Sequence, residues 1–152
     1  MPHPRVVAID YGTKRVGIAI SDPLKMFAQP LGTFDSAGAV DALKSVRDTD
    51  GLDCIVIGWP LSEDGKEGVA TRRVDEFVRR LRNALGKMTV VRWDERHTSE
   101  AARDGLKERG QSVRKGGANG KSPTEAGRLD QAVAGLILQE YLDSIGATGS
   151  LA

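Results

Sequence analysis

Residues 5–22 constrain the fold of this chain more than any other stretch, because they contain two strands joined by a very short turn. Residues 6–9 are continuously apolar, as expected for a strand covered on both faces. Gly12 permits a sharp turn, and Val16, Ile18 and Ile20 alternate in the returning strand. The connection is too short for a helical crossover, so the two strands are predicted to be antiparallel.

The composition is that of an ordinary globular protein. With 152 residues, 39% of them apolar, the chain can bury a proper core, and its formal net charge of +1 indicates no partner. Cys54, the only cysteine, lies in an apolar run, which favours a core residue over a nucleophile. The sequence has no hydrophobic signal core and no apolar run near the ~20 residues of a membrane span, so we expect a cytoplasmic protein. We expect one domain over residues 1–146 and a disordered tail at 147–152.

Strand and helix patterns follow one another along the rest of the chain. Short apolar runs bounded by turn residues predict strands, and apolar residues at helical spacing predict helices. The predicted elements, in chain order, are strands at 6–9, 16–20 and 29–34, a helix capped by Asp35 or Ser36, a strand at 54–57, a helix at 71–85, a strand at 89–95, a helix capped by Thr98 or Ser99, and a long helix from Pro123 or Thr124.

This order predicts an α/β fold with a five-stranded mixed sheet and helices on both faces. The first three strands form an antiparallel meander, whereas the first, fourth and fifth are linked through helices and are therefore parallel. Parallel strands end at the same edge of a sheet, which is where open α/β sheets place their sites. Asp10, the loop from Gly58, and the neighbours Asp94 and Glu95 are predicted to meet there.

Carboxylates that gather at one edge need a compensating charge, because like charges repel and raise one another's pKa. Mg²⁺ or Mn²⁺ can supply this charge, since both ions take carboxylate, water and phosphate oxygens as ligands. Asp130, early in the last helix, is a candidate third ligand if that helix packs across the same edge. Plainer interpretations remain: Asp10 can close a strand at a solvated turn, and Asp130 can favour the N-terminal end of its helix.

Four motifs occur along the chain in a specific order. They are DYGTKRVG at 10–17, GWPL at 58–61 followed by Gly65, DERHT at 94–98, and Asp130 followed by Ala132, Ala134 and the run 137–142. Together they resemble the small bacterial YqgF/RuvX proteins, which have an RNase H-like fold, over nearly the whole chain. The resemblance implies a metal-dependent nuclease whose catalytic and metal-ligating acids carry over to Asp10, Glu95 and Asp130. Glu95 is preferred to Asp94 because it matches the family's glutamate and has the longer reach.

The resemblance also implies a substrate and a cofactor. Two Mg²⁺ or Mn²⁺ ions, roughly 4 Å apart, would bracket the scissile phosphate. The expected activity is 5′-end processing of the 16S ribosomal RNA precursor in ribosome biogenesis. An alternative is resolution of four-way DNA (Holliday) junctions, which requires two active sites and hence a homodimer, through the helix at 71–85 or the last helix. More distant alternatives are an actin-like ATPase-type nucleotide-binding domain, suggested by DYGT at 10–13, and a non-catalytic nucleic-acid-binding module.

Basic residues near the predicted edge are candidates for holding a nucleic-acid backbone. Lys14, Arg15 and Arg96 are close to it in sequence, and the glycine-rich loop at 110–122 could become ordered on nucleic acid. The candidates in that loop are Arg114, Lys115 and Lys121. Such contacts release counterions, so affinity would fall steeply with salt. The plainer interpretations are exposed charges beside a turn and a simple linker, and the arginines of helix 71–85 are expected to form a solvated face.

Overall fold

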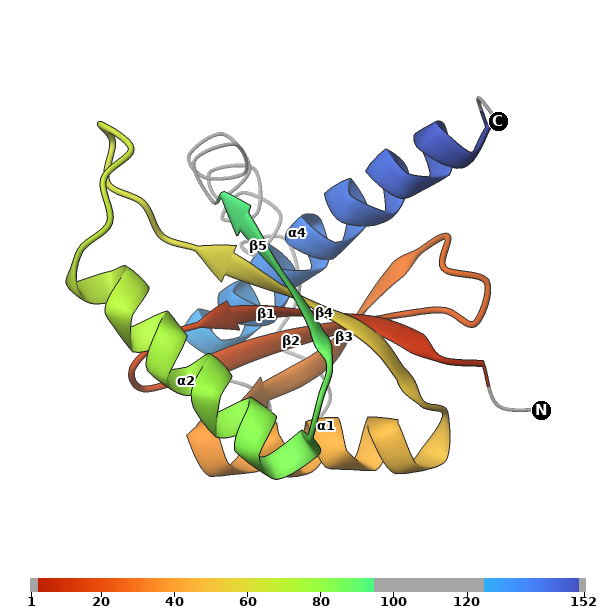
Figure 1. Cartoon of the computed structure of the whole chain (residues 1–152), viewed down its shortest axis with the longest axis horizontal. Coiled ribbons are helices and arrows are strands. Elements are labelled where there is room, and N and C mark those ends of the chain that lie inside the picture. Colours follow the sequence, from red (N-terminus) through yellow and green to blue (C-terminus); the bar gives the residue numbers. More distant parts are fainter. Residues whose placement is uncertain (1–2, 95–124, 151–152) are drawn as a thin grey trace.

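The computed structural model describes residues 3–94 and 125–150. In this part of the chain, one mixed sheet has helices on both faces (Figure 1). β1 pairs with β2 and β2 with β3 in antiparallel fashion, whereas β4 is parallel to both β1 and β5. The predicted sheet is therefore confirmed. Its strands, in the spatial order β3-β2-β1-β4-β5, are β1 (Arg5–Tyr11), β2 (Val16–Ser21), β3 (Ala28–Phe34), β4 (Leu52–Trp59) and β5 (Thr89–Asp94).

β1 and β2 form the predicted tight hairpin. Their register places Asp10 directly opposite Gly17. In the turn, the Gly12 amide donates to the carbonyl oxygen of Arg15 at 2.9 Å. A Cβ at position 12 would lie 2.8 Å from that oxygen, so a side chain there would force the turn open. The glycine therefore fixes where the backbone of Arg15 lies.

Two helices, α1 (Ser36–Thr49) and α2 (Val69–Leu85), cover one face of the sheet. The Asp35 carboxylate accepts the Gly38 amide at 2.7 Å and caps α1, as predicted. α2 begins two residues earlier than predicted. Its first turn is closed by the hydroxyl of Thr71, which accepts the Gly68 amide at 2.9 Å and donates to the Gly68 carbonyl at 2.8 Å.

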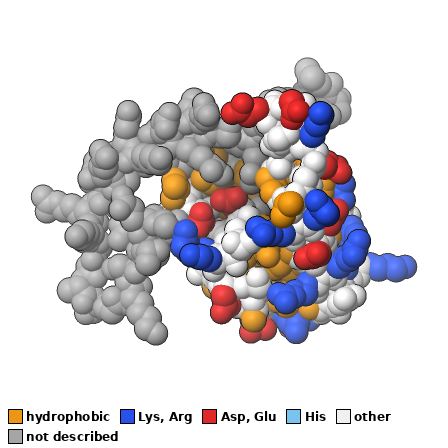
Figure 2. Space-filling view, turned by 90° about the vertical axis from the view of Figure 1, so that its left-hand side faces the viewer, with side chains coloured by type: hydrophobic (Ala, Val, Ile, Leu, Met, Phe, Trp, Pro, Cys, Tyr) orange, Lys and Arg blue, Asp and Glu red, His pale blue; other side chains and the backbone are white. Residues whose placement is uncertain are grey.

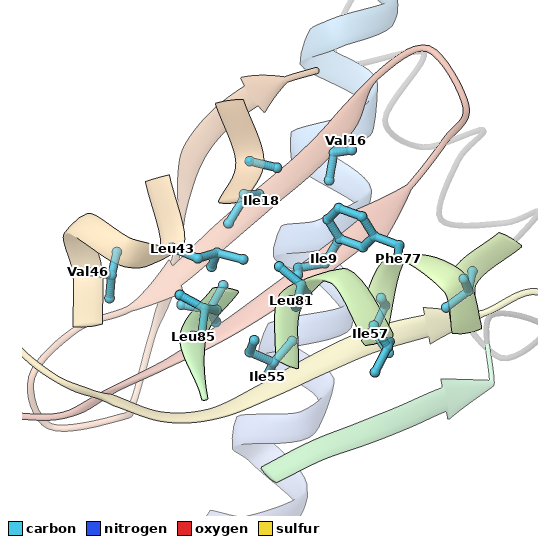
Figure 3. Packing of buried hydrophobic residues seen from close by; sticks show 14 of the residues in the cluster. Ile9, Val16, Ile18, Leu43, Val46, Ile55, Ile57, Phe77, Leu81 and Leu85 are labelled. Atoms are coloured by element: carbon cyan, nitrogen blue, oxygen red, sulfur yellow. The ribbon is translucent and has the colours of Figure 1, made fainter. Parts of the chain in front are cut away.

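The core under α1 and α2 is made of large aliphatic and aromatic side chains. Ile9 and Ile57 from the sheet are fully buried against Leu43 of α1 and Phe77 and Leu81 of α2 (Figure 3). Burial of one such side chain contributes about 1.5–3 kcal/mol to stability. This layer accounts for much of the stability of the fold.

The opposite face is covered by α4 (Glu125–Ser150). The helix continues through Gly146 and Gly149 to Ser150, although the sequence predicted a disordered tail from residue 147, because each glycine costs a helix only about 1 kcal/mol. No helix in residues 3–94 and 125–150 is long and apolar enough to cross a bilayer. The predicted helix after Thr98 or Ser99 and the loop at 110–122 lie outside the described residues. The buried side chains of α4 are Val133, Ala134, Ile137, Leu138 and Leu142.

Candidate active site

The carboxyl ends of β1, β4 and β5 meet at one edge of the sheet, on the left of Figure 1. Asp10 lies near the end of β1 at this edge, and it is only 8% exposed. Figure 2 looks onto this edge and shows acidic side chains next to basic ones near its centre. A buried carboxylate is costly unless its charge is compensated. The low exposure of Asp10 argues against the plain interpretation of a solvated strand end.

Asp10 belongs to the set of β1 side chains that faces α4. Successive side chains of a strand point to opposite faces of the sheet. Ile9 and Tyr11 contact the α1–α2 core, whereas Val6 and Ala8 contact α4. Asp10 continues the second set, so its carboxylate lies on the α4 face.

Gly17 is a point of very close approach between α4 and the sheet. A Cβ at this position would lie 2.3 Å from both the carbonyl carbon and the carbonyl oxygen of Asp130. It would also lie 2.7 Å from the amide nitrogen of Gln131. Gly17 is the cross-strand partner of Asp10, and residues paired in this way have Cβ atoms about 4.5–5.5 Å apart. The backbone of Asp130 therefore rests beside Asp10.

Arg15 holds the side chain of Asp130. Its Nε donates to Asp130 Oδ2 at 2.9 Å, and the two side chains are 44% and 25% exposed. The turn closed by Gly12 positions this arginine, so one hairpin provides both a buried acid and a cation paired with the second acid. A pair this exposed contributes at most about 1 kcal/mol to stability. Its main effect is to offset the negative charge of Asp130 next to Asp10.

Asp94 lies on the opposite face of the sheet from Asp10. Trp93 packs against the α4 side, where its indole Nε1 donates to Glu140 Oε2 at 3.1 Å. Alternation along β5 therefore directs Asp94 to the α2 side, where its partner on β4 is the core residue Trp59.

Lys14 is exposed in the turn between β1 and β2. The other predicted site residues lie outside the described part of the chain: Glu95, Arg96, Arg114, Lys115 and Lys121.

The donor chemistry of Asp10 and Asp130 fits a hard divalent cation, because carboxylate oxygens are ligands that Mg²⁺ and Mn²⁺ prefer. No group of three His, Cys, Asp or Glu side chains within the described ranges could hold an ion. The third predicted ligand, Glu95, lies outside those ranges. The described part of the site thus consists of two neighbouring acids and one arginine.

Cys54 is a core residue, as predicted. It is buried on the α4 side, and its Sγ lies 3.7 Å from the hydroxyl oxygen of Tyr141, to which it donates. Burial raises the pKa of the Cys54 thiol, and burial together with this contact raises the pKa of Tyr141 to about 12. Both groups are protonated at neutral pH, so Cys54 is not an activated nucleophile.

Two features of the site were missed by sequence reasoning. Gly17 is part of a sequence motif, but the sequence did not predict that α4 packs directly against it. The available signal was its place inside a strand, between Val16 and Ile18, since a glycine there often marks the close approach of another backbone. The Arg15–Asp130 pair has no local signal, because 115 residues separate its partners.

A mixed sheet in this order, with an acid near the end of β1 and a second acid on the helix across it, defines an RNase H-like α/β protein of the nuclease class. Two solved structures share this fold. A Fowlpox virus resolvase in complex with Holliday junction DNA superposes with a TM-score of 0.53 at 11% identity, covering 93% of this chain and 98% of that one. T. thermophilus RuvC with a Holliday junction substrate gives 0.54 at 16% identity, covering 95% and 97%.

Sequence comparisons are more specific. The family model described as RuvX, Holliday junction resolvase, matches residues 4–144. A protein of Salinibacter ruber is 50% identical over 142 residues, covering 93% of this chain and 94% of the relative. One of Chlorobaculum tepidum is 46% identical over 142 residues, covering 93% and 95%. Both relatives bear the name "Putative pre-16S rRNA nuclease". The chain belongs to the RuvX family.

Proposed function

We propose that this protein is a divalent-metal-dependent nuclease that processes the 5′ end of the 16S ribosomal RNA precursor in the cytoplasm. The observation that carries the proposal is the contact between Gly17 and the backbone of Asp130, which sets two acids side by side at the carboxyl edge. The names of the relatives with the highest identities quoted above support the RNA substrate. Asp10, Glu95 and Asp130 are the proposed catalytic acids. The position of Asp94 on the other face supports the choice of Glu95.

The chemistry follows from the residues at the edge. Two Mg²⁺ or Mn²⁺ ions, held by the three acids, would activate water and stabilise the departing oxygen. Arg15 and Lys14, in the turn next to these acids, would bind phosphates beside the scissile bond. The planar guanidinium of Arg15 suits two phosphate oxygens at once. Hydrolysis adds water across one P–O bond and leaves a phosphate and a hydroxyl at the new ends.

Four further basic residues are proposed contacts to the nucleic-acid backbone. Arg96 follows the proposed ligand Glu95 directly in sequence, so we expect it to bind a phosphate near the cleaved bond. The other three lie in the glycine-rich stretch 110–122, whose composition supports closure over a bound strand. These three are Arg114, Lys115 and Lys121.

A second candidate activity is the resolution of four-way DNA junctions. The description of the matching family model supports it. Symmetric cleavage of two opposed strands requires two active sites and therefore a homodimer. Cleavage of junctions by a dimer, without cleavage of precursor RNA, would replace the RNA-processing proposal.

The test is a cleavage assay with labelled 16S precursor RNA and labelled four-way DNA junctions, each in Mg²⁺, Mn²⁺ or EDTA. We expect metal-dependent cleavage that is lost in Asp10→Asn. Asp94→Asn is the matched control, because it removes one carboxylate near the same edge but from the opposite face, and it should retain activity. Cleavage that survives Asp10→Asn would exclude this site. Binding without cleavage of either substrate would identify a non-catalytic binding module.

A further inference from the structure

The outward side of α2 has an unusual concentration of exposed arginines. Five of them lie on this helix: Arg72, Arg73, Arg79, Arg80 and Arg82. Within the described ranges, none of the five forms an ion pair with an acidic side chain. The other arginines with described side chains all form such ion pairs: Arg5 with Asp50, Arg15 with Asp130, Arg47 with Asp48, and Arg92 with Asp75.

These arginines recur at helical spacing on the exposed side of α2. We call this surface the α2 arginine face (Arg72, Arg73, Arg79, Arg80 and Arg82). Residues 72 and 79, and likewise 73 and 80, are two turns apart, or about 10.5 Å along the helix axis. Glu76 lies between the two pairs at three or four positions from each arginine, and it is also exposed. At the far end, Arg82 and Lys87 line a surface hollow together with Met88 and Thr89.

The position of α2 connects this face to the candidate active site. The helix follows the loop after β4, so its first turn is near the carboxyl edge, and it then runs away from that edge (Figure 1). In Figure 2, Lys and Arg side chains gather on the right-hand side, which is the side of α2. Arg72 and Arg82 are ten residues apart, or about 15 Å along the helix. The arginines therefore begin at the carboxyl edge that carries the candidate active site, on the other side of the sheet from α4, and extend away from that edge along one direction.

We propose that the α2 arginine face binds the sugar–phosphate backbone of the substrate strand outside the active site. The identity of this ligand as nucleic acid rests on the proposed nuclease function. Arginine suits the task because its planar fork matches two phosphate oxygens, and its charge does not depend on pH. A second copy of the chain fits this face poorly, since a twofold contact through α2 would bring arginines of like charge together. The face thus extends the substrate site rather than forming a dimer contact.

The test measures binding without catalysis. Fluorescence anisotropy with labelled single-stranded RNA and four-way junctions, in EDTA and over a range of salt concentrations, reports affinity and its salt dependence. We expect the variant Arg72→Gln/Arg73→Gln/Arg79→Gln/Arg80→Gln to bind both ligands at least about tenfold more weakly. The slope of log K against log salt should shrink by about 0.7–0.9 for each phosphate that the variant no longer binds. Glutamine preserves helix propensity, and a melting temperature close to wild type will show that the variant is folded.

Two matched variants sharpen the result. Glu76→Gln removes the acid in the middle of the face and should tighten binding. Arg92→Gln removes an arginine that is already paired with Asp75, and it should change binding little. Unchanged affinity and slope in the fourfold variant would overturn the proposal and leave an acidic protein surface as the partner of this face. If no variant cleaves any substrate but the fourfold variant still loses binding, the nuclease proposal fails and this inference stands. If the protein cleaves substrate but the fourfold variant binds as tightly as wild type, the nuclease proposal stands and the inference about the α2 arginine face fails.

Discussion

The two faces of the sheet are built from side chains of different size. On the α1–α2 face, the central strands present Ile9, Ile18 and Ile57, which fill the space under two helices. On the α4 face, two of the same strands, β1 and β2, present Ala8, Ala19 and Gly17. Large side chains keep a helix at a distance and bury much apolar surface, whereas small ones let a helix backbone approach closely. The first face buries the larger side chains of the sheet. The second face also stabilises the fold, by burying Val56, Ile137 and Leu138, and in addition it places the backbone of Asp130 beside Asp10.

The largest effect on stability is expected on the α1–α2 face. Leu81→Ala removes a fully buried side chain and should lower the free energy of unfolding by about 2–5 kcal/mol. Urea denaturation measures this change. The control is Leu24→Ala, at a leucine that is 73% exposed, where we expect a change within about 0.5 kcal/mol. A loss at Leu81 no greater than the loss at Leu24 would contradict the proposed division of roles.

Gly17→Ala should affect the position of α4, and with it Asp130, more than the stability of the protein. The new Cβ would collide with the backbone of Asp130, at a cost of about 1–3 kcal/mol, and α4 would be displaced. We expect Mn²⁺ affinity, measured by electron paramagnetic resonance, to fall about 10–100-fold, as it does when a metal ligand loses its supporting residue. Gly135→Ala is the control on the same helix, because nothing lies within 4 Å of its added Cβ. It should leave Mn²⁺ affinity unchanged, and equal affinities in the two variants would refute the role of Gly17.

Arg15→Gln should change the affinity of the site for Mn²⁺ while leaving the free energy of unfolding almost unchanged, because Arg15 mainly compensates the charge of Asp130. Arg15 occupies Oδ2 of Asp130, so its removal should raise Mn²⁺ affinity about two- to fivefold, with less than about 1 kcal/mol change in stability. Arg92→Gln breaks a pair of similar length and exposure on the other face, 2.8 Å from Asp75, and should not alter Mn²⁺ affinity. Isothermal titration of both variants tests the difference. Lower affinity in Arg15→Gln would mean that the arginine supports the site instead of competing for it.

The smallest effect concerns alkaline pH and the α4 face. Burial, with the Cys54 contact, raises the pKa of Tyr141 from 10.0 to about 12. Below pH 10 the folded and unfolded states both keep this proton, and between pH 10 and 12 the unfolded state loses it first. Stability from this group is therefore present at neutral pH and is lost as pH rises through that window. Tyr141→Phe should show a smaller decline in unfolding free energy from pH 9 to 11 than wild type. An identical decline would show that the group does not contribute.

Much of the fold could be predicted because it depends on local patterns. Apolar runs of four residues, short turns and helical stripes are all readable in sequence, and the order of elements then determines which strands are parallel. The meeting of strand ends at one edge follows from the same topology. Residues 71–85 show the limits of this approach at the helix start, because the Thr71–Gly68 hydrogen bonds that extend α2 depend on side-chain geometry.

The site was less predictable because it depends on contacts between distant segments. The approach of Asp130 to Asp10 requires α4 to lie on Gly17. A glycine inside a strand signals that some backbone comes close, but it does not indicate which distant segment that is. The choice between Asp94 and Glu95 depends on which face of the sheet each side chain points to. A shift of one residue in the strand exchanges the two faces, and the sequence alone does not determine that shift. The arginines of α2 were expected to be solvated. In the structure they are exposed, as expected, and within the described ranges none of them forms an ion pair with an acidic side chain.

The separation of Arg15 and Asp130 by 115 residues also has a consequence in time. A ribosome adds about 5–20 residues per second, so roughly 6–23 s pass between the synthesis of the hairpin and that of the helix that completes the site. During this interval the emerging chain holds Asp10 and Arg15 without Asp130. Under the proposed function, the nascent chain therefore lacks one of its three catalytic acids until its last helix has been made, and it should not cleave RNA before then.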